Sequence, residues 1–521
     1  MDISKDYRHS RQNLRAALND VVQPYNIWNH SPKIGNLLLA ILLLIICLGC
    51  KIHRTEKSFP PDVSPPGAFQ YTSKPSARYS EPWWKTFDSS ELNDLMDVAL
   101  KKNLDVRSSW NRLAQASAIY VINRAGQLPA LRFNSGASIT QTTDKEPLSA
   151  SQEFINIAES LGVPVVDGDL KTENIIVGGG LSYELDIWRR INSLKASARF
   201  NLSATFQDIQ ATAFLVSASV VDAWLSIRQQ VELLKLVHEQ LASNRTQLEL
   251  LELRLSVGQA TALDVLQQRQ QVAATEAAIP ALASVLDTEQ NRLQILLGQI
   301  PMQGLVSTNA VTLPEFIQLP DIGAPIDLLN SRPDLRAAKA RIEAADQDVA
   351  VAVADRLPRL TLNLNYDFQA TEFAGPFNRQ ITSVLGNLTG PIFEGGRRKA
   401  EVKRRQEILK ERINRYTQLF LNALLEVENA LVQERRQNEL IFAMEKQIAH
   451  ALRSLEEARA RFVNGLNDYL PVLTSLQTTQ ALERNLVIER RRRLTFRSNL
   501  LRAIGGVLPE SLLSQSPQTS K

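Results

Sequence analysis

The fold of this chain is decided by residues 185–257, which read LDIWRRINSLKASARFNLSATFQDIQATAFLVSASVVDAWLSIRQQVELLKLVHEQLASNRTQLELLELRLSV. These 73 residues contain neither Gly nor Pro, the residues that most readily break a helix, so they predict one continuous helix. At 1.5 Å per residue the helix would reach roughly 110 Å, several times the width of a compact domain. Its apolar residues recur every seven positions, which keeps a seam facing a neighbouring helix. The seam comprises Val220, Ile227, Leu234, Leu241, Leu248 and Leu255.

The same rod occurs a second time. Adding 207 to each seam position gives Val427, Glu434, Ile441, Ile448, Leu455 and Phe462, of which five in six are apolar. They lie in residues 397–464, another 68 residues without Gly or Pro. The helices expected before the strands, near 105–126 and 334–356, correspond at an offset of 229. The sequence therefore predicts an internal duplication in which residues 141–174 hold an insertion of about 22 residues, placed in a loop between strands.

Between these helices the hydrophobic period changes to two. Extended segments are expected at 131–139, 175–183, 360–368 and 385–393, and Leu360 to Phe368 alternates most regularly. About nine such residues suit a transmembrane β-strand with one apolar and one polar face. Four strands cannot close a barrel in lipid, where no edge can remain unpaired, whereas three chains would supply twelve. We therefore expect an α+β membrane protein in which a trimeric 12-stranded barrel continues into a long α-helical coiled-coil tunnel.

The N-terminus carries targeting information. Residues 37–48 are 12 consecutive apolar residues, which suit the h-region of a signal peptide better than a bilayer span. The sequence Cys47-Leu48-Gly49-Cys50 resembles a bacterial lipoprotein signal, which implies cleavage after Gly49 and a covalent lipid on Cys50. A short membrane anchor with an ordinary cysteine is the alternative. The proline-rich residues 50–80 would then form an extended tether.

Composition argues against several classes of function. The net charge of +4 is small for 521 residues, so the total charge gives no support for a nucleic-acid partner. The basic run Glu489 to Arg493 is interpreted as a solvated helix face paired with nearby acids. Only five His and two Cys are present, and we find no nucleophile–base set, phosphate loop or metal-ligand spacing. We therefore expect no enzyme, metal or cofactor, apart from the lipid on Cys50.

Several motifs in the duplicated order resemble the TolC-type outer-membrane efflux proteins, specifically their lipoprotein branch. They are Trp83-Trp84 with Phe87, Asp105-Val106-Arg107, Arg332 to Ala338, Tyr183 to Trp188, Phe393 to Arg397 and Ala503 to Gly506. The resemblance implies a homotrimeric channel through the bacterial outer membrane and periplasm. It also implies a tripartite pump with a periplasmic adaptor and an inner-membrane transporter of the resistance-nodulation-division type. The expected organisation is a signal peptide at 1–49, a tether at 50–80, repeats at 81–298 and 327–506, a connector at 299–326 and a flexible tail at 507–521.

The candidate functional residues lie at two turns. In similar channels such turns dock the adaptor and close the tunnel, which points to Arg254, Gly258, Leu263, Arg461, Gly465 and Leu470. Each Gly permits a tight reversal and is alternatively only a helix cap. Asp468, with Tyr469 beside it, is the choice for the constriction, because three acidic side chains in a ring favour cations. Asp468 alternatively caps the returning helix, and Asp264 either shares its role or pairs with Arg254.

Two further functions are compatible with parts of this pattern. Within the channel class, the alternative is the exit duct of a type I protein-secretion system. From another class, a lipid-anchored coiled-coil scaffold without a pore would explain the rods but would leave the alternating strands unexplained. Passive export of small toxic compounds or drugs accounts for both features.

Overall fold

The computed structural model describes residues 63–64, 66–69, 82–142, 160, 170–301, 312–314, 322–371, 376–505 and 508. All of them belong to one compact unit, Thr55–Lys521. The predicted signal peptide, Cys50, most of the predicted tether and nearly all of the predicted tail lie outside the described residues.

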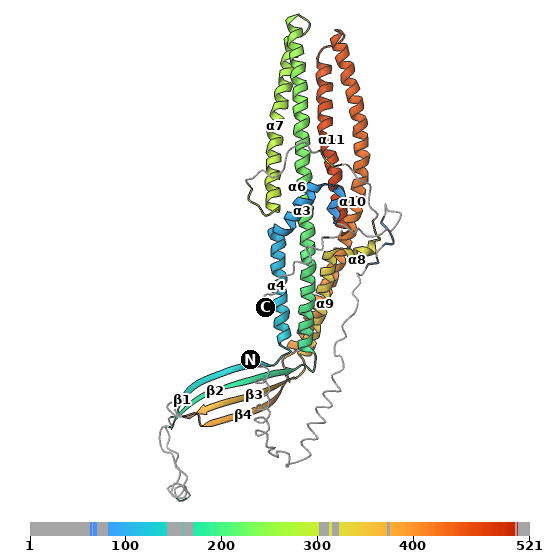
Figure 1. Ribbon diagram of the computed structural model, residues 1–521. Helices are drawn as coiled ribbons and strands as arrows, with labels where there is room; N and C mark the ends of the chain where they lie inside the picture. The colour runs from blue at the N-terminus through green and yellow to red at the C-terminus, as the bar shows by residue number, and fades with distance from the viewer. Residues whose placement is uncertain are drawn as a thin grey trace, which may run out of the picture. The chain divides into compact units, whose positions relative to one another are not determined.

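The same order of elements occurs twice along the described chain: helix, two strands, a long helix and a return helix (Figure 1). The first series comprises α4 (Leu104–Ala125), β1 (Ala130–Thr142), β2 (Leu170–Leu185), α6 (Arg190–Ser256) and α7 (Ala262–Leu296). The second series comprises α9 (Pro333–Ala354), β3 (Arg359–Ala370), β4 (Arg379–Thr389), α10 (Arg397–Val463) and α11 (Leu470–Ala503). Short elements precede each series, namely η2 (Trp83–Phe87) and α3 (Ser90–Lys102), then η3 (Pro325–Asp327) and α8 (Leu328–Ser331).

The two rods are real and equal in length. Helices α6 and α10 each contain 67 residues, or roughly 100 Å of helix. The first rod begins at Arg190 rather than at Leu185 as predicted, because β2 continues to Leu185. Asp186 then accepts hydrogen bonds from the free backbone amides of Ile191 (2.9 Å) and Asn192 (2.8 Å) at the new helix start. Helix α7 is continuous through Pro280.

The strands of the described chain form one antiparallel sheet in the order β1–β2–β3–β4. The prediction for the last strand was wrong at both ends: β4 covers Arg379–Thr389 instead of 385–393. Pairing with β3 sets its register from Gln369↔Arg379 to Arg359↔Thr389. Beyond it Pro391 has no amide hydrogen to donate to a ladder. Ile392 and Phe393 therefore lie outside the sheet.

The register sorts side chains between the two faces of the sheet. One face carries apolar rows such as Leu131, Leu181, Leu364 and Val384, which are successive cross-strand partners. The opposite face carries polar rows such as Arg132, Gly180, Asn365 and Ser383. A Cβ at Gly180 would lie 2.6 Å from Asn365 Oδ1, so this glycine leaves room for the amide above β2. Within the described chain, β1 and β4 each pair with a strand on one side only, so the sheet has two free edges.

A buried aromatic cluster fixes α3 and η2 against the first rod. Trp83 and Trp224 are fully buried, and Phe87 stacks edge-on between them with ring centroids 6.5 and 6.3 Å away. Glu91 of α3 accepts hydrogen bonds from Trp224 Nε1 (3.0 Å) and from Arg228 Nη2 (2.5 Å). Among the described helices only α6 is long and apolar enough to cross a membrane, and 61% of its apolar window is buried. We conclude that these apolar residues serve helix packing.

The basic run behaves as predicted, and so do most seam positions, although Leu255 of the first rod is 38% exposed. Of the heptad positions in the second rod, Val427, Glu434, Ile441, Leu455 and Phe462 are buried. In the basic run, Arg490 pairs with Glu445 (3.1 Å), Arg491 with Asp222 (2.5 Å) and Arg492 with Glu489 (2.9 Å). The run is therefore a paired helix face.

Candidate functional site

The turn between α6 and α7 is closed by the backbone. Gly258 adopts φ 76°, a left-handed conformation that costs other residues about 1–2 kcal/mol. Its amide donates to Leu255 O (3.0 Å), and the Gln259 amide donates to Arg254 O (2.7 Å). These two bonds form a Schellman motif, which satisfies the last carbonyls of the rod.

The turn between α10 and α11 repeats this geometry. Gly465 has φ 67°, and its amide donates to Phe462 O (3.1 Å), while the Leu466 amide donates to Arg461 O (2.8 Å). Arg461 itself lies on the surface and bonds Glu457 Oε1 through Nε (2.8 Å). Both glycines therefore hold the backbone role that the sequence predicts for them, 207 residues apart.

The two return helices begin differently. Helix α7 starts with a capping box, in which Thr261 and Asp264 each bond the backbone amide of the other (3.2 and 2.8 Å). Asp264 therefore does not pair with Arg254, which was one of its two predicted roles. Helix α11 has Tyr469 at its N-cap position, without a capping side chain. The alternative in which Asp468 caps this helix is accordingly wrong, and Asp468 is exposed at the turn.

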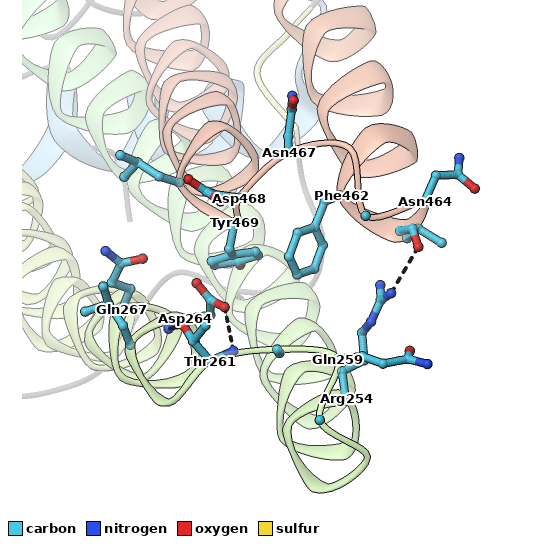
Figure 2. A pocket seen from close by; sticks show the side chains of 16 residues that line it. Arg254, Gln259, Thr261, Asp264, Gln267, Phe462, Asn464, Asn467, Asp468 and Tyr469 are labelled. Atoms are coloured by element: carbon cyan, nitrogen blue, oxygen red, sulfur yellow. Dashed lines mark hydrogen bonds between the residues drawn. The ribbon is translucent and has the colours of Figure 1, made fainter.

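Arg254 joins the two turns (Figure 2). Its guanidinium carbon lies 5.0 Å from the centre of the Phe462 ring, and its Nη2 donates to Val463 O (3.0 Å). The Phe462 ring in turn meets Tyr469 edge-on with centroids 5.2 Å apart. A cation–π contact of this kind contributes about 0.5–1 kcal/mol at exposed sites and more when water is excluded. The first turn is thus held to the second by one arginine.

Tyr469, predicted beside Asp468 at the constriction, is buried between the two hairpins. Its side chain is fully buried and its hydroxyl donates to Gln268 Oε1 of α7 (2.7 Å). Burial raises the pKa of this phenol well above its usual value of 10. The hydroxyl therefore stays neutral and keeps its proton for Gln268. Sequence reasoning missed Gln268, because a lone glutamine in a helix gives no sign of being buried.

A pocket of about 760 Å³ lies between the two turns and is lined from both hairpins, including Asp264, Asp468 and Arg254. Large apolar side chains are exposed around it. Leu263 is 62% exposed, Leu470 54% and Leu466 72%. In water such a group of exposed leucines is typical of a surface that binds another protein.

Comparison with known proteins agrees with this architecture. The family profile described as "Outer membrane efflux protein" matches residues 95–299 and 324–506. The chain belongs to the outer membrane efflux protein family. The chain is 31% identical over 376 residues to the pyoverdine export outer membrane protein OpmQ of Pseudomonas putida, covering 71% of this chain and 76% of OpmQ. It is 28% identical to the outer membrane protein OprJ of Pseudomonas aeruginosa, covering 81% and 86%.

Solved structures extend the likeness of this efflux protein to the fold. The outer-membrane channel OprN superposes with a TM-score of 0.78 at 25% identity, covering 88% of this chain and 99% of that one. A structure of CusC gives a TM-score of 0.75 at 23% identity, which speaks for the fold alone. The efflux protein is accordingly an outer-membrane channel that extends into the periplasm, and its fold combines a helical tunnel with a sheet.

Proposed function

We propose that this efflux protein is a homotrimer in which three four-stranded sheets close into one barrel of twelve strands. The single observation that carries the proposal is the sheet itself, with its two free edges and its faces sorted into apolar and polar rows. In lipid each unpaired backbone group costs several kcal/mol, so β1 and β4 need partners. An even strand number of twelve lies within the range of known barrels.

The apolar face of the sheet would then contact lipid and the polar face would line the pore. The pore-side rows are rich in amides and hydroxyls, such as Asn363, Asn365, Asn387 and Ser383, and Asn365 Nδ2 lies 3.4 Å from Ser383 Oγ. Such groups offer hydrogen bonds, and Arg132 on the same face adds a charge. We infer that a transporter partner, rather than the barrel, sets the substrate.

The tunnel would serve as the passive exit duct of a tripartite pump. Its partners would be a periplasmic adaptor and an inner-membrane transporter of the resistance-nodulation-division type. The exposed leucines around the hairpin turns, Leu263, Leu466 and Leu470, supply an apolar surface for the adaptor, with Arg254 and Arg461 beside it. The exported compounds would be small toxic molecules or drugs. OpmQ is named for the export of pyoverdine, and TtgF is named for the efflux of toluene.

The constriction of the resting channel is assigned to Asp468. It is exposed at the turn, and three copies around a pore axis would form an acidic ring that favours cations. Asp264 is the less suitable carboxylate for the constriction, because it already accepts a hydrogen bond from the Thr261 backbone amide (2.8 Å).

Lipidation of Cys50 completes the proposal. It rests on the apolar run at residues 37–48 and on the Gly49-Cys50 pair that follows it. Intact mass of the purified mature protein tests it, with the Cys50→Ser variant as the control. A diacylated N-terminus at Cys50 in wild type, absent from the variant, is expected. An N-terminus at any other residue would contradict cleavage at this site.

The pore is tested in planar lipid bilayers. Purified wild-type protein should insert and give discrete, long-lived conductance steps. A protein that coats the bilayer without any conductance would support the lipid-anchored scaffold instead.

A further inference from the structure

The margin where the sheet passes into the second rod carries an unusual surface. Helix α10 opens with Arg-Arg-Lys-Ala-Glu-Val-Lys-Arg-Arg at residues 397–405, which contains six cations and one acid. The equivalent residues of the first rod, 190–198, read Arg-Ile-Asn-Ser-Leu-Lys-Ala-Ser-Ala, with two cations. A rod can therefore begin at this level without such charge. We call residues 392–405, together with Arg356 and Arg359, the basic margin.

Helix stability does not explain these cations. The N-terminal end of a helix is its positive pole, so cations in the first turn are unfavourable there and anions are favoured. Helix α10 nevertheless has no acidic residue in its first turn, where Arg397, Arg398 and Lys399 stand. An anion from outside the chain would convert this arrangement into a favourable one.

The acids of the basic margin neutralise only part of it. Glu394 bonds Arg397 (2.9 Å) and Arg398 (2.7 Å), and both arginines lower its pKa. Glu401 bonds Arg404 (2.7 Å) and Arg405 (2.9 Å), which lower its pKa to about 2. These four arginines thus share three carboxylates, because Arg405 also pairs with Asp348 (3.5 Å).

Other cations of the basic margin have N–H donors that their described hydrogen bonds do not use. Lys399 and Lys403 are exposed one helical turn apart, and neither makes an ion pair with a residue that the structure describes. Arg359 and Arg397 each use a single nitrogen, Nη2, in bonds to Asp355 (2.5 Å) and Glu394 (2.9 Å). Since a guanidinium carries five N–H donors, most of theirs remain available.

A pocket of about 250 Å³ lies among these groups, lined by Arg359, Arg397, Arg398, Asp355, Glu401 and Ala352. A few residues before Arg397 the chain exposes two large apolar side chains. Ile392 is 103% exposed and Phe393 is 88% exposed, although neither belongs to a strand. Apolar side chains next to a cationic row match a membrane interface, where acyl chains and headgroups lie a few ångströms apart.

We propose that the basic margin binds anionic glycerophospholipid headgroups in the periplasmic leaflet of the outer membrane. Ile392 and Phe393 enter the acyl layer, Arg397 holds a headgroup phosphate, and Lys399 with Lys403 extends the cationic surface along α10. The inference requires only that the sheet lies in the outer membrane. Its failure would leave the trimeric exit duct untouched.

Native mass spectrometry of the detergent-solubilised wild-type protein tests the proposal. The probes are phosphatidylglycerol and phosphatidylcholine with identical acyl chains, titrated in parallel. Wild type should bind phosphatidylglycerol in clear preference. The variant Lys399→Gln/Lys403→Gln removes two exposed cations without breaking a described ion pair. At about one factor of five per cation near a lipid surface, it should bind phosphatidylglycerol roughly 10- to 30-fold more weakly.

The matched control is Arg435→Gln/Arg436→Gln, which removes two cations from the same helix about 54 Å away and should leave lipid binding unchanged. The variant Ile392→Ser/Phe393→Ser should weaken both lipids alike. Equal binding of the two lipids by wild type would overturn the proposal, as would an equal loss in the control. Displacement of phosphatidylglycerol by millimolar inorganic phosphate alone would indicate a free-phosphate site instead. A changed ion selectivity of the lysine variant, with lipid binding intact, would place the basic margin in the pore.

Discussion

Glu434 is the one seam position at which the second rod departs from the apolar pattern of the first. The structure buries it at 1% exposure against Arg497 at 5%. The pair is bidentate, with Arg497 Nε to Oε2 at 2.9 Å and Nη2 to Oε1 at 2.6 Å. The equivalent residues of the first hairpin, 207 positions earlier, are Ile227 and Gln290. The chain thus carries an uncharged pair, isoleucine and glutamine, at the equivalent positions.

Replacing Glu434 by Ile should destabilise the protein by about 3–5 kcal/mol, because a buried guanidinium loses its carboxylate. The double variant Glu434→Ile/Arg497→Gln gives the second hairpin the residues of the first. It also removes the buried guanidinium that has lost the Glu434 carboxylate. Since buried ion pairs exchanged for well-packed neutral residues are often neutral in stability, the double variant should lie within about 1 kcal/mol of wild type.

Thermal unfolding in one detergent at fixed protein concentration, followed by far-ultraviolet circular dichroism, tests the predicted order of stability among these three proteins. Wild type and the double variant should melt close together, with the single variant well below both. A single variant that melts like wild type would show that Arg497 does not need the Glu434 carboxylate as its charge partner. A double variant as unstable as the single one would show that the cost comes from packing.

Three further predictions concern the hairpin turns. Tyr469→Phe removes the hydroxyl that donates to Gln268 Oε1, which should lower the free energy of unfolding by about 1–3 kcal/mol. The same variant should raise the open probability of the channel in bilayers. Because burial raises the phenol pKa above 10, the stabilising bond is complete below pH 10 and is lost only as the pH rises through the folded-state pKa. Wild-type conductance should therefore be constant between about pH 7 and 9; a rise within that window would contradict the assignment. Gly465→Ala forces φ 67° on a residue with a Cβ and should lower the free energy of unfolding by about 1–2 kcal/mol. The control Gly386→Ala should cost less, because an added Cβ there would lie 3.7 Å from its nearest neighbour. Equal losses in the two variants would argue against backbone strain at Gly465. Asp468→Asn should lower cation selectivity, and unchanged selectivity and conductance would remove the acidic ring.

The architecture could be predicted from the sequence because its signals are local and repeated. A run without Gly or Pro is a property of consecutive residues, and it predicted both rods with α10 correct to one residue. The alternation from Leu360 to Phe368 identified β3 in the same way. The duplication then doubled every signal, since Gly258 and Gly465 could be compared with each other.

Features set by distant partners could not be predicted in this way. Ile392 and Phe393 extend an apolar pattern, yet β4 ends at Thr389 because its register is fixed by β3. The burial of Tyr469 depends on Gln268, which lies 201 residues away. At the offset of 207 residues Asp468 corresponds to Thr261 and Asp264 to Pro471, so only the first turn has the two side chains that complete a capping box.

In the proposed trimer, two further copies of the chain close the free edges of each four-stranded sheet in lipid. Native mass of the detergent-extracted protein tests it most directly. We expect a single assembly of three chains, with no appreciable monomer. A monomer that stays dispersed in water without detergent would contradict it.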